Sequence, residues 1–161
     1  VRDRLEEHLG SERLDRAAGF LHDPGISVVR DAAIINASGE VHAMHDPTEG
    51  GVATGLHEML GAAGLGAVVD EAALPVLPET AAMCEQLGLE PLGLIASGAL
   101  LASVAPQETD AIVAALAEAG IKAAVIGRVR EEPGVVLKAA DGRQRPLRRF
   151  ARDEIARLFE S

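Results

Sequence analysis

The run from Asp46 to Gly51, Asp-Pro-Thr-Glu-Gly-Gly, constrains the fold of this chain more than any other segment. It follows a short apolar stretch at 41–44 that is expected to form a strand, and it precedes a helical pattern at 51–63. Pro47 fixes one backbone angle, and the paired glycines let a helix begin in a conformation that other residues avoid. The segment therefore predicts a well-capped strand-to-helix turn.

The same turn has the parts of a site for a phosphorylated ligand. Backbone amides at a helix start attract anions, and Gly50 and Gly51 let a ligand approach the backbone closely. The carboxylate of Asp46 and the hydroxyl of Thr48 suit a phosphate group that is reached directly or through a metal ion. The alternative is a turn in which Asp46 and Thr48 only shape the loop through local hydrogen bonds.

Apolar periodicity and turn residues predict a single domain over 1–161 of the α+β class, with helices alternating with strands. Aromatic residues make up only 2% of the chain, so Ala, Leu and Val must supply the packing. The apolar run from Leu94 to Val104 is expected to be a buried central strand, in which Gly98 marks a bulge or a close backbone approach. A late hairpin at Asp141 favours a mixed sheet flanked by helices. Helices are expected at 11–21, 27–37, 51–63, 79–87, 107–119 and 153–159, and strands at 41–44, 66–69, 94–104, 123–129 and 135–139.

Composition argues against several classes of partner. The formal net charge of −10 argues against nucleic acid, because that binding depends on neutralising phosphates. No apolar run approaches the roughly 20 residues that span a bilayer, so no membrane is expected. The one cysteine, Cys84, lies among apolar residues and is expected to be a buried hydrophobic side chain, and a lone cysteine favours a reducing cytoplasm.

Two further clusters have alternative readings. His42, His45 and His57 could hold a metal ion, but odd spacing in a strand places His42 and His45 on opposite faces, so surface histidines are the expectation. The arginines between Arg143 and Arg152 could anchor phosphate or an acidic partner. A solvated face with ion pairs to Asp153 and Glu154 is the favoured interpretation of this basic cluster.

The chain resembles the AIR synthase (PurM) superfamily, and within it the AIR synthase-related and HypE-like proteins. The run from His45 to Thr54 is similar to the Asp-Pro-Thr-x-Gly-Gly segment of that superfamily. Three other stretches agree in order: Asp23 to Val29 resembles the entry to this domain, Gly88 to Leu92 a Gly-Leu-Asp/Glu-Pro-Leu segment, and Arg152 to Ile155 the ending of the related proteins.

The resemblance implies the C-terminal domain of an ATP-dependent enzyme, with α/β/α layers that are partly ferredoxin-like. The family pairs this domain with an N-terminal domain that supplies dimer contacts and acidic residues for magnesium-ATP, and that domain would lie upstream of Val1. Family chemistry uses ATP to phosphorylate an amide-type oxygen of a small molecule. Carried over residue by residue, the nucleotide or substrate cleft would be bordered by Asp46, Thr48, Gly50, Gly51, Ser97 and Gly98. Half of such a site is expected to be inactive alone.

Two departures from HypE bear on the reaction. HypE has Ala-Asn-Glu-Gly after its Pro-Leu segment, whereas this chain has Ile95-Ala96-Ser97-Gly98. HypE also ends in a reactive cysteine, whereas this chain ends Leu-Phe-Glu-Ser. The sequence therefore predicts a substrate other than that of HypE, and it leaves open a non-catalytic binding or assembly module that kept the scaffold.

Overall fold

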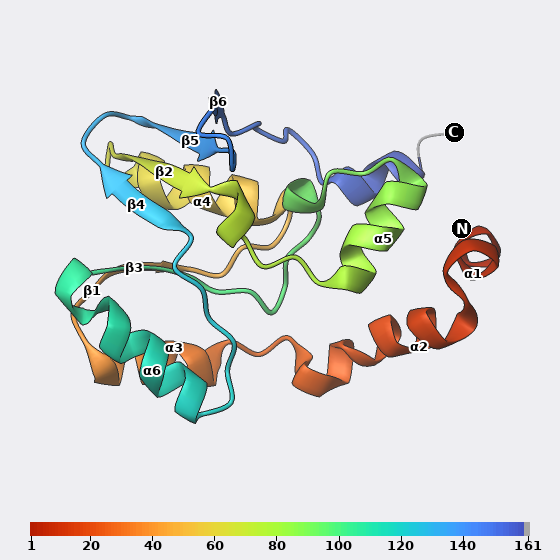
Figure 1. The fold of residues 1–161 in the computed structure, drawn as a ribbon, viewed down its shortest axis with the longest axis horizontal. Coiled ribbons are helices and arrows are strands. Elements are labelled where there is room, and N and C mark those ends of the chain that lie inside the picture. Colours follow the sequence, from red (N-terminus) through yellow and green to blue (C-terminus); the bar gives the residue numbers. More distant parts are fainter. Residues whose placement is uncertain (160–161) are drawn as a thin grey trace.

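The computed structural model describes residues 1–159 and has the α+β architecture that the sequence predicts (Figure 1). The helices are α1 (Arg2–Leu9), α2 (Ser11–Gly19), α3 (Val29–Ser38), α4 (Gly51–Ala62), α5 (Pro78–Leu87) and α6 (Thr109–Glu118). The strands are β1 (Val41–His45), β2 (Gly66–Asp70), β3 (Leu101–Val104), β4 (Gly127–Arg130), β5 (Gly134–Lys138) and β6 (Gln144–Pro146). Short helical turns join them: η1 (Leu21–Gly25), η2 (Glu71–Ala73), η3 (Pro91–Gly93), η4 (Pro106–Glu108) and η5 (Glu154–Leu158).

The strands form two sheets where the sequence predicts one. β1 and β3 make an antiparallel pair, and the other four strands follow the order β4-β2-β5-β6. In this larger sheet β2 is parallel to β5, while β4 and β6 run antiparallel to their neighbours, so the sheet is mixed. None of the helices among residues 1–159 is long and apolar enough to cross a bilayer.

Helix α4 packs against both sheets and contributes to the main core. Its apolar residues Ala53, Leu56 and Leu60 are buried against one face of the four-stranded sheet, behind β2 and β5 in Figure 1. A second cluster of Ile35, Ile112 and Leu116 lies between α3 and α6. Cys84 of α5 is buried with an exposed fraction of 3%, which confirms its interpretation as a core residue.

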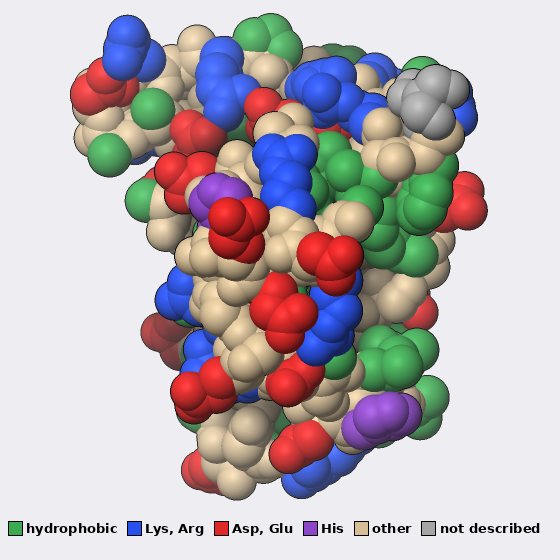
Figure 2. Space-filling model, turned by 90° about the vertical axis from the view of Figure 1, so that its right-hand side faces the viewer, with side chains coloured by type: hydrophobic (Ala, Val, Ile, Leu, Met, Phe, Trp, Pro, Cys, Tyr) green, Lys and Arg blue, Asp and Glu red, His purple; other side chains and the backbone are tan. Residues whose placement is uncertain are grey.

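The N-terminal helices pack against α5 through one buried ion pair. Leu5 and Leu14 are buried, and the Arg16 guanidinium contacts the buried Glu79 carboxylate at 2.5 Å. The pKa of Glu79 lies below its ordinary value because the carboxylate accepts its own backbone N–H and then the Arg16 hydrogen bond. On the side of α1 and α5, acidic and basic side chains alternate along the middle and hydrophobic ones gather at one edge (Figure 2).

The predicted central strand at 94–104 is wrong in extent and in place. Only Leu101–Val104 is a strand, and it pairs with β1 alone. The residues before it form a loop, because Gly98 has a positive φ of 95° and lies against the backbone of Ile26. The apolar residues of this loop pack against other parts of the chain and do not form a strand.

The chain ends also differ from the expectation. Helix α1 has no apolar stripe, since Leu5 is its one buried residue, and the sequence analysis did not predict it. Strand β6 is three exposed residues, and its antiparallel pairing with β5 confirms the hairpin predicted at Asp141. The helix expected at 153–159 is the short turn η5, whose first N–H groups are capped by the Asp153 carboxylate.

Replacing Gly51 by alanine tests how tightly the start of α4 is packed. Gly51 has a φ of +65°, and an added Cβ would lie 2.3 Å from the Leu94 carbonyl oxygen. We expect Gly51→Ala to lower the free energy of unfolding by at least about 2 kcal/mol in urea titrations.

Gly61→Ala is the matched control, because Gly61 lies in the same helix and its Cβ would meet nothing within 4 Å. This variant should raise the free energy of unfolding by about 0.5–1 kcal/mol through helix propensity. Equal effects of the two variants would contradict the packing argument.

Candidate functional site

The six residues predicted to border a cleft lie on two adjoining loops. The carbonyl oxygen of Thr48 accepts the N–H of Ala96 at 3.2 Å and the N–H of Gly51 at 3.1 Å. These bonds join the turn at 46–51 to the loop at 94–100. Asp46, Thr48, Ser97 and Gly98 are exposed, so the structure brings the polar candidates to one surface edge.

Both glycines of the turn are buried and lie against other parts of this chain. Around Gly51, the carbonyl oxygens of Leu92 and Leu94 would lie 2.5 and 2.3 Å from an added Cβ. At Gly50, whose φ is +73°, an added Cβ would meet the Thr54 hydroxyl oxygen at 2.3 Å. Their assignment to a nucleotide or substrate cleft stays a prediction.

The anion at the start of α4 is also the protein's own. The N–H of Gly50 donates to Asp153 Oδ2 at 2.8 Å, and Asp153 Oδ1 accepts the N–H of Ile155 at 2.9 Å. A carboxylate beside a helix N-terminus is stabilised by the helix dipole. Sequence reasoning missed Asp153 as a partner of the turn, because 103 residues separate it from Gly50. The one sequence feature that pointed to Asp153 was the segment 152–155, which is similar to the ending of the related proteins.

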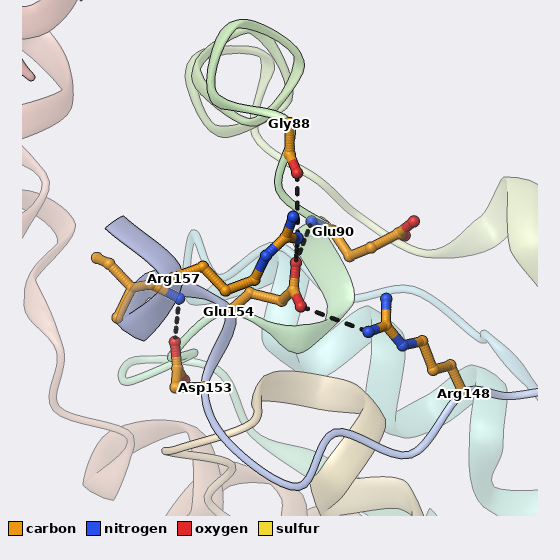
Figure 3. Close-up of polar contacts among 7 residues, drawn as sticks. Gly88, Glu90, Arg148, Asp153, Glu154 and Arg157 are labelled. Carbon is orange, nitrogen blue, oxygen red and sulfur yellow. Dashed lines mark hydrogen bonds and ion pairs between the residues drawn. The ribbon is translucent and has the colours of Figure 1, made fainter. Parts of the chain in front are cut away.

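The neighbouring Glu154 fixes the C-terminal segment to the end of α5 (Figure 3). Its Oε2 atom accepts the Arg157 guanidinium at 2.6 Å and the N–H of Glu90 at 3.1 Å, while Arg148 lies 3.8 Å from Oε1. Arg157 also donates to the carbonyl of Gly88 at 3.2 Å. Burial opposes ionisation of Glu154, but these hydrogen bonds and the arginine charges outweigh it, so its pKa is lowered from the ordinary value of 4.5.

The basic cluster between Arg143 and Arg152 is mostly engaged in local contacts. Arg143 pairs with Asp141 at 2.6 Å and Arg145 with Glu71 at 2.5 Å. Arg148 pairs with Glu154 and stacks over the Phe150 ring, 4.6 Å from its centroid. The expected ion pairing with Glu154 is confirmed, whereas the Asp153 carboxylate accepts the backbone N–H groups of Gly50 and Ile155.

The histidines make separate contacts. His45 Nε2 lies 2.9 Å from Glu58, His57 Nε2 lies 3.2 Å from the Leu147 carbonyl, and His42 is exposed. Burial lowers the pKa of His57, which favours its neutral form. Within residues 1–159, no group of three His, Cys, Asp or Glu side chains could hold a metal ion.

Two surface hollows lie away from the predicted edge. The larger, about 180 Å³, has a leucine floor that includes Leu92 and Leu137, with Arg145 and Arg148 among its other lining residues. The smaller, about 120 Å³, lies between His57 and Gly134. Neither hollow is lined by any of the six residues predicted from the sequence.

Comparison with known proteins finds a matching family and similar curated proteins. The family described as AIR synthase related protein, C-terminal domain, matches residues 6–140. The carbamoyl dehydratase HypE of Rhizobium leguminosarum bv. viciae is 42% identical over 113 residues, which cover 63% of this chain and 32% of that protein. The chain thus spans about a third of the length of this curated relative.

Solved structures agree with this similarity. The crystal structure of Escherichia coli HypE, a hydrogenase maturation protein, superposes with a TM-score of 0.73 at 33% identity, covering 81% of this chain and 42% of that one. A HypE in complex with ATP superposes with a TM-score of 0.66 at 33% identity, covering 72% of this chain and 38% of that one. The fold predicted from the sequence is therefore confirmed. Of the final residues Leu-Phe-Glu-Ser that the sequence analysis compared with HypE, Glu160 and Ser161 lie outside the described residues.

Replacing Glu154 by glutamine tests the C-terminal ion-pair network. The variant keeps the shape but removes the charge, and we expect it to lower the free energy of unfolding by about 1–3 kcal/mol at neutral pH. Because the pKa of Glu154 is lowered in the folded state, its contribution is present above pH 4.5 and is lost as the pH falls through the folded pKa. The difference between wild type and variant should therefore shrink on acidification in urea titrations.

Glu71→Gln is the matched control, since it breaks the exposed pair with Arg145. An exposed ion pair contributes about 0–1 kcal/mol, so this variant should change stability little. A Glu154→Gln effect that is no larger than the Glu71→Gln effect, or that does not depend on pH, would contradict the assigned network.

Proposed function

The chain belongs to the AIR synthase related C-terminal domain family, and on that premise we propose that it is the C-terminal half of an ATP-dependent enzyme that activates an amide-type oxygen by phosphorylation. The observation that carries the proposal is the polar edge where the turn at 46–51 meets the loop at 94–100. Three side chains with oxygen donors, Asp46, Thr48 and Ser97, are exposed along it.

An exposed edge of this kind is one wall of a site. Phosphoryl transfer depends on positioning and on charge stabilisation in a water-excluded space, whereas Asp46, Thr48 and Ser97 are exposed in this chain. We infer that an N-terminal domain of the same protein closes the site and supplies the other magnesium ligands. Such a domain would also provide the contacts of a homodimer.

The donor atoms on the edge suit magnesium-ATP. Among residues 1–159, Asp46 has no hydrogen bond or ion pair, so its carboxylate is available to a magnesium ion. The Thr48 hydroxyl is exposed beside it and could donate to a phosphate oxygen. The Gly50 N–H is already bonded to Asp153, and ATP would therefore meet side chains here and not the start of α4. ATP supplies the γ-phosphoryl group that turns an amide oxygen into a leaving group.

The reaction class follows from this chemistry. The amide oxygen of the substrate attacks the γ-phosphorus, ADP leaves, and the phosphorylated oxygen departs as phosphate when a nucleophile attacks or a proton is lost. A carbamoyl dehydratase, as the curated relative is named, is one case of this class. Ala96 and Ser97 stand where HypE has an amide and a carboxylate, and we infer that the substrate differs.

The second candidate is a binding or assembly module that has lost the chemistry. The contact between Asp153 and Gly50 favours it, because the protein's own carboxylate occupies the helix start. Reading the upstream part of the protein separates the two candidates. Acidic magnesium ligands in a Gly-Asp-rich N-terminal domain support the enzyme, and their absence supports the module.

Replacing Asp46 by alanine tests the proposed site in the chain joined to its upstream half. Loss of a magnesium-binding carboxylate should lower kcat/KM for magnesium-dependent ATP turnover by about a hundredfold. Glu49→Ala is the control, because Glu49 is an exposed carboxylate on the same turn. Unchanged ATP affinity and turnover in Asp46→Ala would refute the role of Asp46.

The isolated chain tests the division of the site between two domains. We expect it to fold cooperatively and to show no ATP hydrolysis above background in a coupled assay, because half of the ligands are missing. Robust turnover by residues 1–161 alone would show that the division is wrong.

A further inference from the structure

One face of the four-stranded sheet carries no helix. The residues Ala67, Val69, Val135 and Leu137 are buried against α4, with exposed fractions of 1–4%. Side chains alternate along a strand, so the residues between them lie on the opposite face. In Figure 1 this second face is turned to the viewer, and none of the described helices lies in front of it.

Three cations lie on this open face. The register places Arg128 of β4 beside Val68, Arg130 beside Gly66, and Lys138 of β5 beside Asp70. None of the three cations forms an ion pair within residues 1–159. The Nε atom of Arg130 is buried without a hydrogen-bond partner among the described residues. We call Arg128, Arg130 and Lys138 the cation triad.

The triad forms no ion pair, and neither do Arg13 and Arg30, whereas other arginines of residues 1–159 are paired. Six arginines elsewhere are paired with carboxylates: Arg2, Arg16, Arg143, Arg145, Arg148 and Arg157. Asp70 lies beside Lys138 in the register, and its carboxylate accepts the N–H of Ala72 at 3.1 Å. Three cations and one carboxylate leave this face with an excess of positive charge on a protein of net charge −10, which fits an acidic partner.

The spacing of the triad matches the width of a helix. The arginines of β4 and the lysine of β5 are separated by β2, which is two strand spacings or about 10 Å. The half-buried Val68 of β2 lies between them, and the half-buried Val136 lies on β5, two residues before Lys138. A helix with its side chains is about 10 Å wide, and sheets of this kind are usually covered by helices. The face therefore has an apolar centre on β2 and β5, with two cations on β4 and the third at the end of β5.

We propose that this face docks an amphipathic acidic helix of a partner protein. The apolar stripe of the helix lies along β2 and β5 on Val68 and Val136. Acidic side chains on one flank of the helix reach Arg128 and Arg130, and those on the other flank reach Lys138. The buried Nε of Arg130 then gains a carboxylate acceptor.

A synthetic helix tests the proposal on the full chain. The probe is a peptide of about 18 residues with leucine at helical spacing and glutamate on both flanks, and the comparison peptide carries lysine in place of glutamate. Titration calorimetry should show at least about tenfold tighter binding of the glutamate peptide, weakening as salt is raised. Equal binding of the two peptides would overturn the proposal.

Charge reversal locates the binding face. The double variant Arg128→Glu with Arg130→Glu should lose at least about tenfold in affinity for the glutamate peptide and should gain affinity for the lysine peptide. The control double variant, Lys122→Glu with Arg143→Glu, has the same change of charge outside the sheet and should bind as wild type does. The gain for the lysine peptide shows that the first variant is folded.

Two outcomes contradict the proposal. Loss of binding in both double variants would show that overall charge, and not this face, attracts the peptide. Concentration-dependent dimers of the wild-type chain that disappear in Arg128→Glu with Arg130→Glu, measured by sedimentation, would show that a second copy covers the face.

Discussion

The close approach of two backbone carbonyls to Gly51 is the constraint on which the arrangement of this domain depends. Only a residue without a Cβ permits Leu92 and Leu94 to lie against the start of α4, and this contact holds the loop at 94–100 beside the turn at 46–51. Because α4 also packs on both sheets, the same position determines how the two halves of the domain meet. The Asp153 carboxylate then closes the helix start from the other end of the chain.

Local patterns predicted the elements whose apolar residues repeat at a regular spacing. Helix α4 and the burial of Cys84 follow from such spacing, and the Asp46 turn follows from its glycines. Patterns failed where a distant partner decides the conformation. The apolar run at 94–100 is a loop because it packs against α4 and Ile26, and Asp153 reaches Gly50 across most of the chain. The spacing of apolar residues along the chain gives no information about contacts between residues so far apart in the sequence.

In the candidate site too, features of the turn itself were predicted, whereas contacts with distant segments were not. The exposed oxygen atoms of Asp46 and Thr48 were predicted from the turn, and the structure places Ser97 on the adjoining loop. The glycines were predicted to border a ligand, and in this chain Gly51 admits the backbone carbonyls of Leu92 and Leu94 while Gly50 lies against the Thr54 side chain. What the family resemblance adds is that the relatives are about twice as long as this chain.

The parallel pairing of β2 with β5 has a consequence for how the chain folds. Gly66 pairs with Gly134, roughly 70 residues later, and contacts of such long range slow the search for the native state. During synthesis, the apolar stripe of α4 emerges long before the strand that completes its cover. Ribosome-bound chains that do not yet extend to residue 138 therefore expose the apolar side chains of α4. Binding by a chaperone would protect the chain most at this stage of synthesis.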